Sequence, residues 1–211
     1  MDFTYGEKEI EYLKAKDKRL GEAIDQIGYI HRSVMPDCFV ALVYNIIGQQ
    51  ISTAALNTIW NRLMQLAQEV NPETIDALSE EQLQTLGMSY RKAKYIKEFA
   101  AKVRNGELDL DELQKMNNEE VIKELCKLRG VGKWTAEMIL IFSMQRMDVV
   151  SYGDFGILRG MRMLYHHRKI DKKLFDKYAR RYSPYGTVAS FYLWAIAGGA
   201  IPGLKDYQEK R

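Results

Sequence analysis

Apolar side chains recur with the period of an α-helix along almost the whole chain of 211 residues. Over Asp37–Gly48 they are spaced three and four residues apart, and Pro36 and Ser52 stand where helices commonly begin. Ser79 opens a capping box and Asn117 caps a further helical pattern. Strand patterns are scarce. The sequence therefore predicts an all-α protein of about ten short helices.

The length fits one compact domain, residues 1–211, built of two closely packed helical subdomains. We expect the first subdomain to cover about residues 36–115. We expect the second to cover residues 116–211, together with the N-terminal segment, which is predicted to form a helix over residues 7–27.

Charge and cysteine content limit the possible classes of protein. The formal charge of +3 permits nucleic-acid binding without arguing for it. Cys38 and Cys126 lie in apolar helical patterns and are predicted to be buried free thiols; two cysteines cannot hold a four-cysteine iron–sulfur cluster. The histidines lack zinc-ligand spacing, and no apolar run is long enough to span a bilayer, so a reducing, cytoplasmic location fits.

The segment Leu128–Ala136 places two glycines, one residue apart, between two helical patterns. Glycine permits a tight turn and a close approach by another backbone, and the first N–H groups of a helix attract anions. A plain turn between helices is the alternative interpretation. As a phosphate site, the segment would use Arg129, Gly130, Gly132, Lys133 and Thr135.

Residues 80–93 repeat this pattern weakly, with a helix, a turn at Gly87 and a second basic helix. Arg91, Lys92 and Lys94 at that helix start are candidate phosphate contacts, although such charges also simply solvate a helix face. Short helical hairpins often look alike, so functional duplication stays open.

Four segments in order resemble one known family. The segment Leu128–Ala136, followed 22 residues after Gly132 by Asp154, resembles the helix–hairpin–helix DNA glycosylase superfamily. Three more segments resemble its 3-methyladenine DNA glycosylase II branch: Ile46–Ala55, Leu86–Ala93 and Tyr182–Trp194. The resemblance implies an active-site cleft between the two subdomains, a monomer and damaged double-stranded DNA as partner.

The resemblance implies hydrolysis of a base–sugar bond after the nucleotide is flipped out of the helix. Asp154 would stabilise positive charge on the sugar and orient water. An alkylated purine is already cationic, so an aromatic pocket suits it; the candidates are Trp134, Tyr185 and Met138. Asp154 could equally cap the helix that begins at Phe155, and the aromatic residues could be core.

Four residues are candidates for contacts inside the duplex. Gln49 and Gln50 would fill the gap left by the flipped base, or would merely interrupt a helix. Met88 or Tyr90 would be the wedge that enters the base stack, or an exposed turn residue.

Relatives that also cleave the strand place a lysine where this chain has Trp134, and Lys133 is turned by about 100° from that position on a helix. We therefore expect no lyase activity. No cofactor is expected. The resemblance allows only a structural Na⁺ or K⁺ at the carbonyls of Cys126, Leu128 and Val131.

Two other functions remain open. The same fold could act on oxidised or deaminated bases, which would need more hydrogen-bonding groups in the pocket than an aromatic slot provides. A non-catalytic helix–hairpin–helix module could bind DNA for a partner, although Asp154 in its expected place argues against it.

Overall fold

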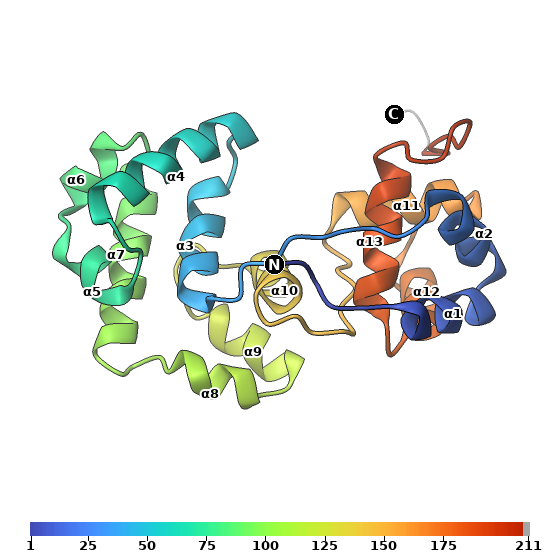
Figure 1. Ribbon diagram of the computed structural model, residues 1–211, viewed down its shortest axis with the longest axis horizontal. Coiled ribbons are helices and arrows are strands. Elements are labelled where there is room, and N and C mark those ends of the chain that lie inside the picture. Colours follow the sequence, from blue (N-terminus) through green and yellow to red (C-terminus); the bar gives the residue numbers. More distant parts are fainter. Residues whose placement is uncertain (209–211) are drawn as a thin grey trace. The chain divides into compact units, whose positions relative to one another are not determined.

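The computed structural model describes residues 1–208, and the regular structure within them is helical. Thirteen helices follow one another in this part of the chain (Figure 1). The one exception is an isolated antiparallel bridge between Asp2 and Ser33. The all-α prediction is confirmed, with more helices than expected. The six-residue helices Pro72–Ala77 and Leu110–Lys115 are too short to show a clear apolar period, and the expected N-terminal helix is two helices.

The chain divides into two compact units. The hairpin unit comprises Met35–Met144. It contains α3 (Cys38–Gly48), α4 (Thr53–Ala67), α5 (Pro72–Ala77), α6 (Glu80–Thr85), α7 (Tyr90–Arg104), α8 (Leu110–Lys115), α9 (Asn118–Leu125) and α10 (Lys133–Phe142).

The terminal unit comprises Met1–Val34 and the described part of Gln145–Arg211. It contains α1 (Glu7–Lys16), α2 (Lys18–Ile27), α11 (Phe155–Tyr165), α12 (Lys172–Tyr182) and α13 (Gly186–Ala197).

Helix α3 forms the centre of the hairpin unit and packs against α4, α7 and α10. Its apolar residues Leu42, Val43 and Ile46 are fully buried, and the ring of Phe39 stacks on Phe99 of α7 with centroids 4.8 Å apart. Burial of this apolar surface drives the association of helices that would be marginal alone.

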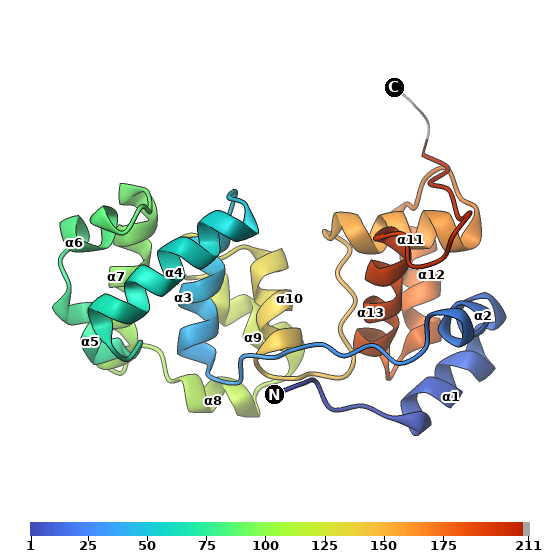
Figure 2. The ribbon, with the colours of Figure 1, turned by 45° about the horizontal axis from the view of Figure 1, so that its top comes forward.

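The terminal unit is organised around α11 and α13, which cross in close contact (Figure 2). Gly160 makes this contact possible, since a Cβ atom there would lie 2.2 Å from the backbone oxygen of Leu193. The helices therefore meet backbone to backbone, and the start of α11 is fixed against α13.

The boundary between the subdomains differs from the one expected. Residues 116–144 belong with residues 35–115, because α9 packs on α10 and α10 packs on α3. The expected helix over residues 7–27 is also broken, because the buried Asp17 caps α2 by accepting from the Leu20 N–H group (3.0 Å).

The two cysteines differ in their surroundings. Cys38 is buried as expected, and burial raises the pKa of its thiol to about 12. Cys126 is exposed, contrary to expectation, because it follows the last turn of α9 on the side away from the core. Among residues 1–208, no helix combines the length and the apolar composition needed to cross a bilayer.

Candidate active site

Asp154 occupies the N-cap of α11 and is 7% exposed. Its Oδ1 atom accepts hydrogen bonds from the Ile157 N–H group (2.9 Å) and from the Trp194 indole Nε1–H group (2.8 Å). The positive end of the helix dipole favours an anion at this position. Helix capping and the expected catalytic role are therefore compatible for Asp154, because the cap fixes one oxygen of the same carboxylate.

Trp194 is the aromatic residue beside the carboxylate, and it was not selected as a site residue from the sequence. A Cβ atom at Gly156 would lie 2.8 Å from Trp194 Cδ1 and 3.2 Å from Asp154 Oδ1. The glycine thus leaves room for the indole ring to reach the acid. A tryptophan in the last segment of the resemblance, together with a glycine two residues after Asp154, was the available sequence signal.

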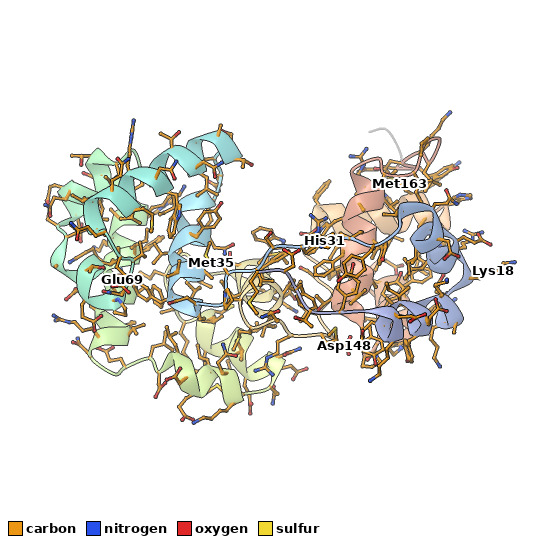
Figure 3. All side chains as sticks on the ribbon, in the orientation of Figure 1. Lys18, His31, Met35, Glu69, Asp148 and Met163 are labelled. Atoms are coloured by element: carbon orange, nitrogen blue, oxygen red, sulfur yellow. The ribbon has the colours of Figure 1, made fainter. Side chains whose placement is uncertain are left out.

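Tyr185 lies at the opposite end of α13 from Trp194, about 14 Å away along the helix axis at 1.5 Å per residue. Its ring packs edge-on against Tyr12, with centroids 5.0 Å apart. Asp148, labelled in Figure 3, accepts from the Gly186 N–H group (3.1 Å) at the same end. The expectation that Tyr185 lines a pocket at Asp154 is therefore corrected: Tyr185 packs where α13 begins.

The glycine turn of the hairpin unit has the predicted form. Gly130 adopts φ +82°, and a Cβ atom there would lie 2.5 Å from the ring of Tyr95. The Gln49 amide Nε2–H donates to the Gly130 carbonyl oxygen (2.7 Å). Gln49 therefore holds the turn in place, and this contact competes with its expected role inside the duplex. Gln50 is exposed and stays a candidate.

Helix α10 starts after Gly132 with no side-chain cap, whereas Ser89 caps the corresponding helix α7. At Gly132 φ is −97°, and a Cβ atom would meet nothing within 4 Å. Among residues 1–208, no neighbouring atom requires glycine at this position. The two helical hairpins thus differ at the helix start, and only α10 presents an uncapped one.

The polar side chains around this turn differ in their exposure to solvent. Arg129 and Lys133 are largely exposed and lie near Glu98 (3.2 Å) and Glu137 (3.9 Å), respectively. Thr135 is only 5% exposed. This burial argues against the expected role of Thr135 as a phosphate contact.

Trp134 is 44% exposed on the first turn of α10 and can meet a ligand. Met138 lies one turn further along the same helix face but is 5% exposed. Trp134 therefore stays a candidate contact residue, whereas Met138 lies in the core of the hairpin unit.

The turn before α7 separates the two wedge candidates. Met88 is 6% exposed and belongs to the core, so its expected insertion into a duplex is wrong for this conformation. Tyr90 is 55% exposed at the start of α7. Of the two, Tyr90 therefore stays the candidate for the side chain that enters a base stack.

Lys92 has a structural partner that the sequence did not show. Its ammonium group donates to the carbonyls of Ile47 (2.8 Å) and Gln49 (2.6 Å) at the end of α3. Burial, and then the charge of Arg91, lower the pKa of Lys92. Lys92 is therefore a helix-capping residue rather than a phosphate contact, whereas Arg91 is exposed.

The carbonyls that the resemblance assigns to a monovalent cation follow α9. Helix α9 ends at Leu125, so the following carbonyls lack helical partners. The Leu128 carbonyl accepts from the Val131 N–H group (3.1 Å) and keeps a second lone pair. Such an ion would add positive charge at the hairpin.

Residues 43–184 match the family model of the HhH-GPD superfamily of base excision DNA repair proteins. The chain belongs to this superfamily. Within it, DNA-3-methyladenine glycosylase 1 of Schizosaccharomyces pombe is 34% identical over 158 residues, which cover 72% of this chain and 69% of that protein.

Solved structures of HhH-GPD relatives agree over nearly the whole chain. DNA-3-methyladenine glycosidase from Bacillus halodurans has a TM-score of 0.85 and 37% identity, covering 94% of this chain and 93% of that chain. The Schizosaccharomyces pombe 3-methyladenine DNA glycosylase in complex with abasic DNA has a TM-score of 0.77 and 30% identity, covering 90% and 96%.

Proposed function

We propose that this chain is a monofunctional DNA-3-methyladenine glycosylase of base excision repair. The observation that carries the proposal is Asp154, held at the N-terminus of α11 by the Ile157 and Trp194 donors. The named relatives support the choice of substrate. The enzyme hydrolyses the bond between an alkylated purine and its deoxyribose in duplex DNA.

The chemistry needs one carboxylate. As the base leaves, positive charge develops on the sugar, and an anion fixed beforehand stabilises it without reorganising. The two N–H donors hold Asp154 Oδ1, so the carboxylate is oriented before the DNA binds. An alkylated purine leaves as a neutral base and therefore needs no separate general acid. The Trp194 ring beside the acid offers a cationic base a π-face.

The second part of the proposal concerns the DNA backbone. The uncapped start of α10 and the glycine at position 132 suit close approach by a phosphate. Arg129 and Lys133 add charge beside it, Tyr90 enters the base stack, and Gln50 fills the gap left by the flipped base. Trp134 stands where relatives that also cleave the strand have a lysine. The enzyme therefore releases the base and leaves the strand intact.

We expect Gly132→Ala to weaken binding to duplex DNA about tenfold or more, because a methyl group would stand where the phosphate approaches. Stability should stay within about 0.5 kcal/mol, since φ suits alanine and the added Cβ meets no atom within 4 Å. Affinity titrations and thermal melts measure the two effects. Unchanged DNA affinity would contradict a phosphate at Gly132.

The deciding experiment is chromatography of the free bases released from methylated duplex DNA. We expect release of 3-methyladenine with intact abasic strands. Strand cleavage without added base or heat would contradict the monofunctional assignment. DNA binding without base release would contradict the substrate, and duplexes with oxidised or deaminated bases would then separate another lesion class from a non-catalytic module.

A further inference from the structure

Helix α12 of the terminal unit carries a line of cations on one face. Lys173, Lys177 and Arg180 are spaced by four and three residues, so they lie along one side of the helix, and all three are exposed. They span about 10 Å along the axis, at 1.5 Å per residue. We call these three residues the α12 stripe.

The stripe has no acidic partners within the part of the chain that the structure describes. Elsewhere some exposed lysines pair with an acid three residues before them, as Lys127 does with Glu124 and Lys115 with Glu112. The single acid of α12, Asp176, pairs with Lys172. Like charges three and four residues apart destabilise a helix, so the stripe has a cost that an anionic partner would offset.

The surroundings of the stripe extend the positive surface. A hollow of about 340 Å³ is lined by Lys18, Arg19, His167 and Arg181, with Asp17 bound to Arg181 at its base. Burial, and then the charges of Arg19 and Lys177, lower the pKa of His167. Tyr178 and Arg181 of α12 also line this hollow, so it adjoins the helix that carries the stripe.

The start of α12 lies beside the segment that leads to Asp154. The Tyr152 ring contacts Phe175 of α12, with centroids 5.0 Å apart, and the Lys172 ammonium lies 5.8 Å from the centre of the Tyr152 ring. Tyr152 precedes Asp154 by two residues. The stripe therefore runs along a helix whose first turn adjoins the catalytic segment of the same unit.

We propose that the α12 stripe binds the phosphate backbone of duplex DNA flanking the damaged nucleotide. The proposal rests on the proposed function, because it needs a nucleotide at Asp154. A DNA strand carries one phosphate per about 3.4 Å of duplex axis, so a 10 Å line of three cations matches two or three phosphates. Such contacts are independent of base sequence, and they hold the enzyme on DNA during its search.

The test removes the three charges together in Lys173→Gln/Lys177→Gln/Arg180→Gln. Binding to an undamaged duplex is measured between 50 and 400 mM salt, over which the Debye length falls from about 14 Å to about 5 Å. We expect the slope of log affinity against log salt to fall by about 1 to 3 units, and affinity to fall more than tenfold at the lowest salt. The same loss should appear in the DNA concentration needed for half-maximal base release.

The control Lys8→Gln/Lys115→Gln/Lys205→Gln makes the same change in net charge at exposed positions elsewhere and should keep the parent slope. Lys173→Arg/Lys177→Arg should also keep it, because the charges remain. If the triple variant kept the salt slope of the parent protein, the proposal would be overturned. Base release by the parent protein would not be affected by that result, so the proposed function would stand. The same salt titration is made with single-stranded RNA. If the triple variant lowered the slope for RNA but kept the parent slope for duplex DNA, the proposal would also be overturned, because the partner would then be another nucleic acid.

Discussion

Asp154→Asn is expected to slow base release by about 10³-fold, within the range found when a positioned acid or base is removed. Asparagine keeps an oxygen that accepts from the Ile157 and Trp194 donors and is itself a good N-cap. Stability and DNA affinity should therefore stay near those of the parent. Single-turnover assays on methylated duplex, thermal melts and binding titrations distinguish these effects, and full activity would refute the mechanism.

Trp194→Phe serves as the companion variant, because it removes the N–H donor and keeps an aromatic ring. Loss of a hydrogen bond to a charged group corresponds to about tenfold or more in rate. If Trp194 acts through the carboxylate, adding Trp194→Phe to Asp154→Asn should lower the rate of base release little further, because the effects of residues that act as a unit are not additive. Losses that multiply would show that the indole acts on the substrate independently.

Gly160→Ala is expected to destabilise the protein by about 3 kcal/mol or more, the upper part of the range for overpacking. The added Cβ would lie 2.2 Å from the Leu193 backbone oxygen, and a backbone atom cannot rotate away. Helices α11 and α13 must separate, and the Trp194 donor then moves from Asp154. We expect a melting temperature lower by about 6–12 °C and slower base release at temperatures where the variant is folded.

Gly153→Ala is the matched control for this prediction, because it lies in the same unit and its Cβ would have no atom closer than 4.0 Å. Its melting temperature should stay within about 2 °C of the parent value. If Gly160→Ala melted like this control, the backbone contact between α11 and α13 would not limit stability.

The sequence predicted the elements whose determinants are local. The capping box at Ser79, the caps at Asn117 and Ser52 and the turn at Gly130 all appear where the residues indicated. Each depends on residues within a few positions, and a side-chain oxygen three residues before an N–H group caps it in almost any context. The order of the motifs likewise predicted the superfamily that the family model confirms, and it made Asp154 the candidate catalytic residue.

Pairings between distant segments were not predictable in this way. Asp17 breaks the expected N-terminal helix because Tyr165 and Arg181, from α11 and α12, satisfy its carboxylate once it is buried. The sequence indicates Lys92 as a phosphate contact, but in the structure its ammonium group donates to the carbonyls at the end of α3. Met88 and Tyr90 are two residues apart in one turn, and only packing decides that one is buried and the other exposed.

By itself, then, the sequence determined the all-helical fold and the glycine turn, and it singled out Asp154 as the candidate catalytic residue, because capping, helical periodicity and glycine turns act over a few residues. The tertiary structure decided which aromatic side chain serves that acid. Trp194 and Tyr185 share one helix and similar chemistry, but the close packing of α11 on α13 at Gly160 brings only Trp194 within hydrogen-bonding distance of Asp154.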